Sequence, residues 1–319
     1  MADQSQHIWF NGKILPWEKA KIHVMSHVLH YGSGVFEGIK CYLTDKGPAI
    51  FKLPEHIDRL FLSAIKYKMK IPFTKQELMQ GCIDMVHLNK FTECYIRPIA
   101  FYGYDTLGVH PKKCPVEVAI ASFYWGAYLG EEGLNSGVNI TISPWKKLSN
   151  DSFPPSAKAS GQYMNSLLAV QDAREKGFDE ALLINHNGYI AEGSGQNIFI
   201  IKDGIIFTND QQSSILMGIT RECIIKICND LNKKVEITNL TKDMLFSADE
   251  AFFTGSASEI TPIATVDKKP INNGKPGDIT LELKNIYSRI IHGKETNYLD
   301  WLTLVDANIP ESETLLENQ

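Results

Sequence analysis

Lys158 is a lone cation among small residues, in the stretch Ser156-Ala-Lys-Ala-Ser-Gly161. A lysine that forms a Schiff base must be neutral part of the time, and a tight, partly dry site lowers the pKa of such an amine. Small neighbours also allow a flat cofactor ring to approach the backbone. The alternative is a lysine at the start of a helix with no chemical role, and this stretch alone does not decide between the two.

Glu192 comes directly before a glycine-rich turn, in the stretch Gly188-Tyr-Ile-Ala-Glu-Gly-Ser-Gly-Gln-Asn-Ile-Phe199. A carboxylate that leaves a strand into such a turn can be held rigidly against a ring nitrogen. Pyridoxal phosphate needs such a partner, because a protonated pyridine nitrogen makes its ring an electron sink. The Gly-Ser-Gly pattern is no dinucleotide fingerprint, since it lacks the third glycine and opens no clear helix.

Two further turns have the composition of a phosphate site. Gly218 precedes a helical pattern with Thr220 near its start, and the free N–H groups of a helix N-terminus attract anions. The second turn offers Ser256 and Ala257 as donors, and Arg59 could add a charge-assisted bond. Most helix caps bind nothing and most helix-face arginines are solvated, so these features count only in combination.

The elements that must position these groups follow from hydrophobic periodicity. The pattern predicts amphipathic helices over residues 55–68 and 75–88, and further helices at about 162–176, 220–232 and 279–292. It predicts strands over residues 49–53, 93–101, 116–123, 138–143, 180–185, 189–192, 198–202 and 204–208. Asn187-Gly188 and Asp203-Gly204 are strong hairpin signals between neighbouring strands.

The stretch Gly130-Glu-Glu-Gly-Leu-Asn-Ser-Gly137 has three glycines and two acids, which is typical of a linker. We therefore expect an α/β or α+β protein of two domains. The predicted organisation is a small α/β domain over residues 1–130, a linker over 131–137, a large cofactor-binding domain over 138–304 and a polar C-terminal tail over 305–319.

The composition is that of a soluble globular protein, with 44% hydrophobic and 22% charged residues and a net charge of −5. No block rich in lysine or arginine occurs, so neither a nucleic-acid nor a membrane partner is expected. The N-terminal residues MADQSQHIWFNG lack the basic and apolar regions of a signal peptide. The six cysteines are scattered and form no CxxC pair, so we expect reduced thiols and a cytoplasmic location.

In the order arginine, lysine, glutamate, Gly-Ile-Thr and Gly-Ser-Ala, the chain resembles the class IV (fold-type IV) pyridoxal-phosphate enzymes, most closely the bacterial branched-chain amino-acid aminotransferases. The resemblance extends from about Ile8 to about Trp301. Besides the Lys158 segment and EGSGQNIF, its most specific parts are HVLHYGSGVFEGIKCY (27–42), YIRP (95–98), GVHP (108–111), GITR (218–221) and TGSASEITP (254–262). It implies a larger domain that forms a pseudo-barrel rich in antiparallel strands.

The resemblance also implies pyridoxal 5'-phosphate as the cofactor, bound as a Schiff base to Lys158. Lys158 would then move a proton between the substrate Cα and the cofactor C4′. Glu192 would pair with the pyridine nitrogen, and Tyr163 would bond the phenolic oxygen. The phosphate ligands that the resemblance implies are Arg59, Ile219, Thr220 and Ser256.

The implied reaction is transfer of an amino group between L-leucine, L-isoleucine or L-valine and 2-oxoglutarate by ping-pong kinetics. Ser256, Ala257 and Tyr95 would receive the substrate carboxylate, and Arg97 would meet the distal carboxylate of glutamate. The residues implied for the side-chain pocket are Phe36, Gly38, Tyr31, Trp125 and Tyr128, with Leu107 and Val109 from a neighbouring subunit. The family forms homodimers, often assembled into hexamers.

Alternatives inside the family are D-amino-acid aminotransferase, aminodeoxychorismate lyase and amine transaminase, which share the lysine, the glutamate and the phosphate turn. The YIRP, GVHP and FEGIKCY segments favour the branched-chain enzyme.

A remote alternative is a metal-dependent enzyme. His23, His27 and His30 would share one face of a helix, although the same stretch reads equally well as strand and loop. A Ser-His-Asp hydrolase lacks its G-x-S-x-G motif. A non-enzymatic binding or scaffold protein would not need the lysine and the glutamate together in glycine-rich turns.

Overall fold

The computed structural model describes residues 5–126 and 128–305, and the chain divides into two compact units. Unit 1 comprises Met1–Trp125, Ala157–Gly161 and Arg289–Gln319, and unit 2 comprises Gly126–Ser156 and Gln162–Ser288. Five residues around Lys158 therefore belong to unit 1, although the chain on both sides of them belongs to unit 2.

This division differs from the domain boundaries predicted above. The segment predicted as a linker forms a short helix, α4 (Gly130–Ser136). The Lys158 segment and the residues from Arg289 onward group with unit 1 instead of with the larger domain. Composition indicates a boundary between two units near residue 130. It cannot show that later segments of the chain pack in the first unit again. The predicted tail lies outside the described residues, apart from Val305.

Unit 1 is built on an eight-stranded sheet in which every neighbouring pair is antiparallel. The strand order is β17-β5-β4-β6-β7-β1-β2, and β3 also pairs with β6. Because β3 and β4 pair with successive parts of β6, the residues between them lie beside the middle of that strand, around Arg97 and Pro98. The strands are β1 (His7–Phe10), β2 (Lys13–Pro16), β3 (Gly34–Phe36), β4 (Ile39–Thr44), β5 (Gly47–Phe51), β6 (Cys94–Tyr102), β7 (Val116–Phe123) and β17 (Leu302–Leu304).

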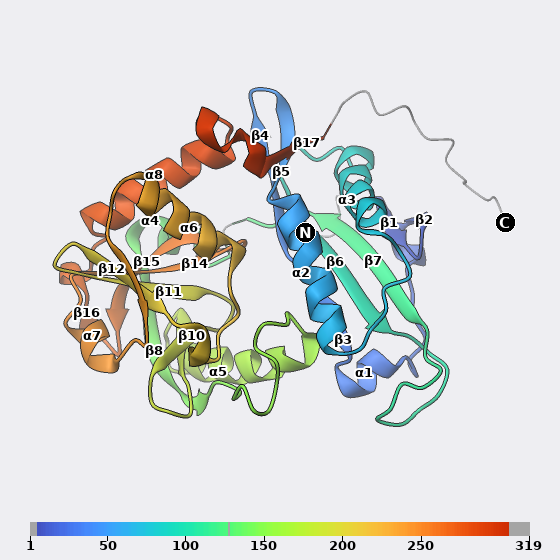
Figure 1. Ribbon diagram of the computed structural model, residues 1–319, viewed down its shortest axis with the longest axis horizontal. Coiled ribbons are helices and arrows are strands. Elements are labelled where there is room, and N and C mark those ends of the chain that lie inside the picture. The colour runs from blue at the N-terminus through green and yellow to red at the C-terminus, as the bar shows by residue number, and fades with distance from the viewer. Residues whose placement is uncertain (1–4, 127, 306–319) are drawn as a thin grey trace. The chain divides into compact units, whose positions relative to one another are not determined.

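Two long helices, α2 (Leu53–Lys66) and α3 (Lys75–Leu88), pack on this sheet (Figure 1). Their apolar faces bury Leu60, Leu78 and Met85 against Ile96 and Ile120 of the central strands. The short elements of unit 1 are α1 (His27–Tyr31), η2 (Trp17–Lys19) and η6 (Thr296–Trp301).

Unit 2 is built on a nine-stranded mixed sheet with the order β10-β9-β8-β15-β14-β11-β12-β13, and β16 pairs with β15. Ile190 of β10 forms a bridge to Leu240, just beyond β13, and its carbonyl accepts a hydrogen bond from Asn209 Nδ2 at the end of β12. The first and last strands thus approach each other and the sheet is curled. The strands are β8 (Val138–Lys146), β9 (Glu180–Ile184), β10 (Ile190–Gly193), β11 (Asn197–Lys202), β12 (Ile205–Asn209), β13 (Val235–Thr238), β14 (Glu250–Gly255), β15 (Glu259–Val266) and β16 (Lys269–Pro270).

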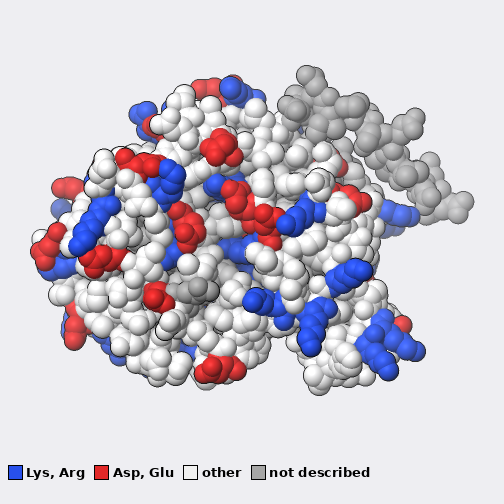
Figure 2. Space-filling view, in the orientation of Figure 1, with Lys and Arg blue, Asp and Glu red and all other residues white. Residues whose placement is uncertain are grey.

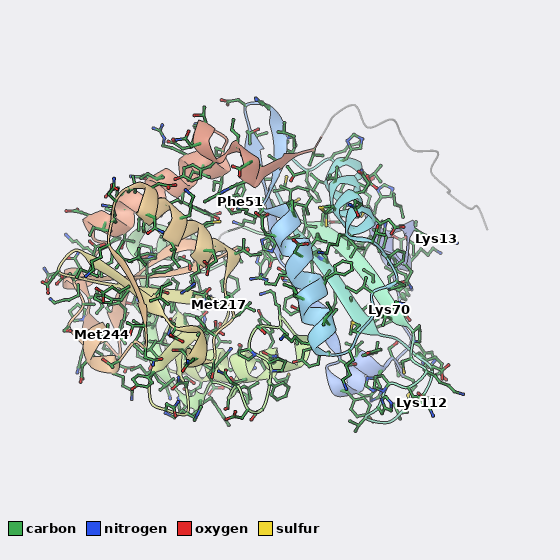
Figure 3. All side chains as sticks on the ribbon, in the orientation of Figure 1. Lys13, Phe51, Lys70, Lys112, Met217 and Met244 are labelled. Carbon is green, nitrogen blue, oxygen red and sulfur yellow. The ribbon has the colours of Figure 1, made fainter. Side chains whose placement is uncertain are left out.

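The core of unit 2 lies against this sheet and includes the fully buried Leu182, Ile200 and Phe253. Met244 packs against it from outside (Figure 3). The helices are α4, α5 (Tyr163–Glu175), α6 (Ile219–Asp230), α7 (Lys242–Phe246) and α8 (Asp278–Ile291), with η3 (Ser160–Gln162), η4 (Gln211–Ser213) and η5 (Asn272–Gly274). The division between the units falls within α8 and within η3.

The predicted α/β fold class is confirmed, and so are both hairpins. Strands β9 and β10 are antiparallel around the Asn187-Gly188 turn, and β11 and β12 are antiparallel around Asp203-Gly204. Gly188 has φ +88, and Asp203 and Gly204 have φ +50 and +74, which is the backbone that asparagine, aspartate and glycine tolerate best. The predicted helices and strands all occur, with ends displaced by a few residues.

Acidic and basic side chains are interspersed over the visible face of unit 2, whereas basic side chains predominate on the lower right of the visible face of unit 1 (Figure 2). All six cysteines are buried free thiols. Within residues 5–126 and 128–305, no helix combines the length and the apolar character that crossing a membrane requires.

A buried arginine joins α6 to the sheet of unit 2. Arg221 is completely buried, and its Nε donates to Thr208 Oγ1 at 3.3 Å. Its Nη2 donates to the carbonyl of Asn209 at 3.0 Å, and its Nη1 pairs with the half-exposed Glu222. These bonds fix the start of α6 against the end of β12.

We expect Arg221→Ala to lower the free energy of unfolding by about 3 kcal/mol, because hydrogen bonds to charged groups contribute roughly 1.5–3 kcal/mol each. Lys226→Ala is the matched control, since Lys226 on the same helix forms only an exposed pair with Asp230. That control should change stability by less than about 0.5 kcal/mol. Urea unfolding of the three proteins is the measurement, and equal effects of the two substitutions would contradict the anchoring role.

Candidate active site

The Lys158 segment is held in unit 1 by backbone hydrogen bonds on both sides. The backbone N–H of Lys158 donates to Ser63 Oγ at 3.0 Å, and its carbonyl accepts from the N–H of Phe36 at 3.0 Å. The N–H of Gly161 donates to the carbonyl of Gly32 at 3.0 Å. A Cβ added at Gly32 would lie 2.8 Å from the Cα of Gly161, so the two chain segments meet where neither has a side chain.

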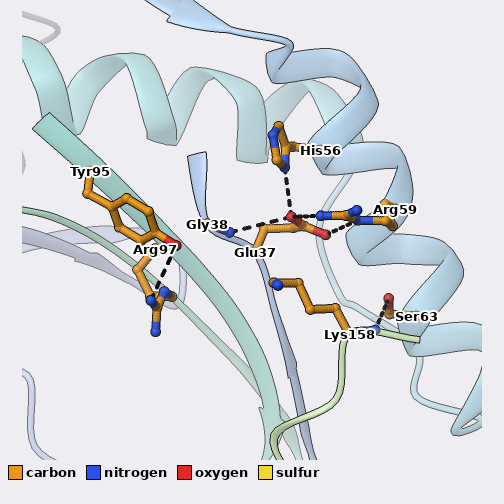
Figure 4. Close-up of polar contacts among 8 residues, drawn as sticks. All are labelled: Glu37, Gly38, His56, Arg59, Ser63, Tyr95, Arg97 and Lys158. Atoms are coloured by element: carbon orange, nitrogen blue, oxygen red, sulfur yellow. Dashed lines mark hydrogen bonds and ion pairs between the residues drawn. The ribbon is translucent and has the colours of Figure 1, made fainter. Parts of the chain in front are cut away.

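The amine of Lys158 lies beside a charged cluster (Figure 4) and near the aromatic ring of Phe36. Its Nζ is 5.2 Å from the centre of the Phe36 ring, and the side chain is only half-buried. The amine is therefore held by a rigid backbone but remains within reach of a small molecule.

Glu37, Arg59 and His56 form a buried cluster beside this lysine (Figure 4). Arg59 Nε and Nη2 donate to the two oxygens of Glu37 at 2.7 and 2.8 Å, and His56 Nδ1 lies 2.7 Å from Glu37 Oε2. Glu37 and His56 are almost completely inaccessible to solvent. The guanidinium thus uses two of its five donors on Glu37, which fixes its plane.

The electrostatics of this cluster favour an ionised glutamate. Burial by itself raises the pKa of Glu37, but the charge and hydrogen bonds of Arg59, with those of His56, outweigh it and hold that pKa well below its usual range. Burial lowers the pKa of His56, and the positive charges of Arg59 and Lys158 act in the same direction against the opposing effect of Glu37. Both groups therefore favour their deprotonated forms.

Arg97 lies in an aromatic frame on β6. Its Cζ is 4.9 Å from the centre of the Phe36 ring, 5.1 Å from Tyr95 and 5.9 Å from Trp125, and Nη2 donates to the Tyr95 hydroxyl at 3.4 Å. Its Nε is buried and has no hydrogen-bond partner among the described residues. A Cβ at Gly38 would lie 1.7 Å from the Tyr95 hydroxyl oxygen, so only glycine allows this position of the ring.

The other pocket residues predicted in unit 1 lie on its surface. Tyr31, Leu107 and Val109 are 41%, 56% and 81% exposed. The ring of His27 brings their two segments together, because its nitrogens lie 2.7 Å from Ser33 Oγ and 2.8 Å from the carbonyl of Gly108.

In unit 2, Glu192 lies on β10 and is held by three donors. Lys147 Nζ lies 2.6 Å from Oε1, while Asn197 Nδ2 and the backbone N–H of Leu216 donate to Oε2 at 3.3 and 3.2 Å. The side chains of Lys147 and Glu192 are 12% and 8% exposed. This is the rigid carboxylate that the sequence predicted, with a lysine partner that it did not.

A second buried glutamate, Glu180, organises the glycine-rich turn after Glu192. One of its oxygens accepts hydrogen bonds from Ser194 Oγ at 2.8 Å and Gln196 Nε2 at 3.0 Å. Burial raises the pKa of Glu180, and its hydrogen bonds oppose this only in part. Burial raises the pKa of Tyr128, a predicted pocket residue, and the nearby Ser194 opposes this only in part.

The predicted phosphate residues lie at two chain turns of unit 2. Ile219 and Thr220 are the first residues of α6, and its N-cap Gly218 supplies no side-chain cap, so the first N–H groups keep the character of an anion site. Ser256 and Ala257 occupy the turn between β14 and β15. Tyr163 is the first residue of α5.

The structure thus groups the predicted residues within each unit. Lys158, Phe36, Arg59, Tyr95 and Arg97 belong to unit 1. The predicted residues in unit 2 are Tyr128, Tyr163, Glu192, Ile219, Thr220, Ser256 and Ala257.

The histidines of the metal alternative each have separate contacts. His27 is bound as described above, His30 Nε2 lies 3.0 Å from the carbonyl of Val24, and His23 stacks on Tyr104. Only His27 and His30 belong to α1. Among the described residues, no group of three His, Cys, Asp or Glu side chains is placed to hold a metal ion.

Sequence reasoning missed Glu37, His56 and Lys147. Glu37 lies inside the FEGIKCY segment and His56 three residues before Arg59, so both were visible as ionisable neighbours of predicted residues. Lys147 is 45 positions from Glu192 and carries no local signal.

The donor set fits pyridoxal phosphate. The cofactor has an aldehyde, a basic ring nitrogen and a phosphate, and the chain offers a clamped lysine amine, a buried carboxylate and a helix N-terminus without a side-chain cap. Thr254 Oγ1, near the end of β14, and Ser258 Oγ, on the turn that carries Ser256, are buried without a hydrogen-bond partner among the described residues. Such orphaned hydroxyls are expected at a site that hydrogen-bonds a ligand.

Known proteins resemble the chain over most of its length. Residues 34–266 match the family model described as amino-transferase class IV. The chain is 42% identical over 305 residues to the branched-chain-amino-acid aminotransferase of Salmonella typhimurium. This match covers 95% of this chain and 99% of that protein.

Solved structures give the same result. The T.th. branched-chain amino acid aminotransferase with pyridoxamine 5'-phosphate is similar at a TM-score of 0.92 and 44% identity, covering 95% of this chain and 99% of that one. The complex of the T.th. enzyme with N-(5'-phosphopyridoxyl)-L-glutamate has a TM-score of 0.90 and 42% identity, with the same coverage.

We expect Glu37→Gln to lower the free energy of unfolding at pH 7 by about 3–5 kcal/mol, because it leaves a buried guanidinium without its counter-ion. The pKa of Glu37 is lowered in the folded state, so its contribution is complete above the ordinary glutamate pKa of about 4.3. It is lost as the pH falls further toward the folded-state value. The difference between wild type and variant should therefore be constant near neutral pH and shrink below about pH 4.

Glu55→Gln is the control, because Glu55 is half-exposed and pairs only with Lys52. Denaturant unfolding at several pH values measures both variants. A pH-independent difference, or equal small effects of the two substitutions, would contradict the role assigned to Glu37.

Proposed function

The chain belongs to the class IV aminotransferases, and from this premise we propose that it moves an amino group between L-leucine, L-isoleucine or L-valine and 2-oxoglutarate. The proposed cofactor is pyridoxal 5'-phosphate, and the proposed kinetics are ping-pong. The observation that carries the substrate assignment is the half-buried Arg97 within its aromatic frame, with its buried Nε. The relatives support it, because they are named branched-chain enzymes and one of them is solved with a phosphopyridoxyl-glutamate.

We assign the proton transfer to Lys158. Pyridoxal phosphate, when bound, supplies an electron sink for the bond that breaks at the substrate Cα. Lys158 Nζ would hold the cofactor covalently until substrate arrives and then carry the proton between Cα and C4′. The backbone clamp on the Lys158 segment restricts this movement to the side chain.

The remaining cofactor contacts are assigned by chemistry. Glu192 would accept a hydrogen bond from the protonated ring nitrogen, and Tyr163 would donate one to the phenolic oxygen. The proposed phosphate ligands are Arg59, Ile219, Thr220 and Ser256. For Arg59 this role uses donors other than the two that Glu37 already holds.

The proposed substrate pocket combines apolar walls with one cation. Ser256, Ala257 and Tyr95 would receive the α-carboxylate, and Arg97 the distal carboxylate of glutamate. An aliphatic side chain would instead contact the rings of the frame and need no charge. The proposed walls are Phe36, Gly38, Tyr31, Trp125 and Tyr128.

We further propose a homo-oligomer, with a dimer as the minimal unit and a hexamer as a possible assembly, in the cytoplasm. The exposure of Tyr31, Leu107 and Val109 supports it, because large apolar side chains gathered at a surface indicate a contact site. Leu107 and Val109 would complete the pocket of a neighbouring subunit.

The first test is the absorption spectrum of the purified protein with pyridoxal phosphate. We expect a yellow band that L-leucine converts to the pyridoxamine form and that D-alanine, added to a fresh sample, leaves unchanged. Lys158→Ala should abolish turnover and leave the cofactor only non-covalently bound. Conversion by D-alanine alone would assign the chain to the D-amino-acid branch. Failure to take up the cofactor would overturn the proposal.

Arg97→Ala should raise the KM for glutamate by about 30- to 150-fold and that for leucine much less. A charge-assisted pair with a buried carboxylate contributes about 2–3 kcal/mol, whereas leucine contacts only the rings. Half-reaction kinetics with each amino donor separate the two effects within one variant. An equal loss for both donors would show that Arg97 is structural.

A further inference from the structure

Lys147 is the cationic partner of the carboxylate assigned to the ring nitrogen. It directly follows β8, and its backbone N–H donates to the carbonyl of Ile184 at 2.9 Å, which fixes the base of its side chain. Its Nζ lies 2.6 Å from Oε1 of Glu192. The neutral donors Asn197 and Leu216 contact the other oxygen, Oε2.

The burial of this pair determines what the lysine does. A carboxylate in a site of low polarity takes up a proton unless a cation compensates its charge. Asn197 and Leu216 supply only neutral donors, so Lys147 is the one full positive charge recorded on Glu192 among the described residues. Glu180 in the same unit shows the contrast, because its hydrogen bonds come from neutral donors and its pKa is raised by burial.

We propose that Lys147 is a positioning residue that keeps Glu192 ionised and oriented, and thereby keeps the shared proton on the ring nitrogen of the cofactor and not on the carboxylate. This inference rests on the proposed function. It assigns to Lys147 control of the electron sink, although Lys147 itself need not touch the substrate.

The direction of the effect follows from charge. A proton between a ring nitrogen and a carboxylate has two positions, one an ion pair and one a neutral pair. Because Lys147 Nζ contacts the carboxylate itself, at 2.6 Å from Oε1, its charge should stabilise the anionic carboxylate more than it opposes a cation bound to that carboxylate. It therefore favours the ion pair, and its removal shifts the proton toward Glu192. Each unit by which the pKa difference between ring nitrogen and carboxylate changes alters the ratio of ion pair to neutral pair tenfold.

The test compares Lys147→Met with Lys146→Met in the full-length holoenzyme. Lys146 is the adjacent residue, is exposed, and loses the same charge in the control. The probe is pyridoxal phosphate labelled with ¹⁵N in its ring, whose chemical shift reports protonation independently of turnover. We expect Lys147→Met to move this shift toward the unprotonated value and to lower kcat at least tenfold with a smaller change in KM. Lys146→Met should match the wild type in all three.

Lys147→Arg is the conservative variant and tests whether the positive charge is what matters. It should retain the wild-type ring-nitrogen shift and most of kcat, which also keeps the test decisive if Lys147→Met fails to fold. In the protein without cofactor, Lys147→Met should lower the melting temperature, and less so in a Glu192→Gln background, where there is no anion to leave unpaired.

The outcomes separate the two proposals. If the wild type binds pyridoxal phosphate and transaminates, but Lys147→Met keeps the ring-nitrogen shift and kcat of Lys146→Met, the role of Lys147 is overturned and the proposed function stands. A Lys147→Arg variant that loses the protonated ring nitrogen would overturn it as well. A wild type that takes up no pyridoxal phosphate would overturn both.

Discussion

The backbone clamp on residues 157–161 is the constraint on which the candidate site depends. It takes five residues out of unit 2 and hydrogen-bonds them to Ser63, Phe36 and Gly32 of unit 1. The small residues around Lys158 are explained in part by this packing, since Ala157 and Ala159 are buried and Gly161 meets Gly32 backbone to backbone. Larger side chains would separate these two chain segments. The same packing therefore holds Lys158 in place and explains the small residues around it.

Buried carboxylates in this protein are stabilised in two different ways, and the difference separates their roles. Glu37 and Glu192 each have a cation within hydrogen-bond distance, and for Glu37 this pairing holds the pKa well below its usual range. Glu180 accepts hydrogen bonds from neutral groups, and burial raises its pKa. A carboxylate of the second kind suits a structural anchor of a turn. One of the first kind offers a fixed negative charge, which is what a basic ring nitrogen or a neighbouring guanidinium requires.

Much of this architecture is readable from the sequence, because periodicity and turn chemistry are local. The helix over residues 75–88 is found at its predicted ends, and the two hairpins follow from their Asn-Gly and Asp-Gly pairs. The five-residue helix α1 is too short to show a period, which is why its histidines read equally well as strand. Likewise, composition alone cannot distinguish a glycine-rich linker from the short helix α4.

The residues that the sequence did not predict are ion-pair or hydrogen-bond partners that lie far apart along the chain. His56 and Arg59 lie 19 and 22 positions from Glu37, and Lys147 is 45 positions from Glu192. No local pattern marks such a pair, because the fold alone brings its members together. What the sequence does reveal is the group that needs a partner, namely a carboxylate or a guanidinium in an apolar segment, and the physical cost of burying it unpaired predicts that one exists.

Under the proposed function, Arg97 would allow one pocket to accept two kinds of side chain. Three aromatic rings lie within 6 Å of its guanidinium carbon, and such contacts contribute about 0.5–2 kcal/mol each depending on how far they are desolvated. The rings therefore stabilise the cation when no anion is present, yet leave the buried Nε without a hydrogen-bond acceptor. A carboxylate would complete that set of bonds, while an aliphatic chain would pack on the same rings. A single site that alternates between a charged and an apolar amino donor needs an arginine whose charge is only partly compensated. An arginine already paired with a carboxylate would gain nothing from binding glutamate. An arginine without any compensating contact would exclude leucine.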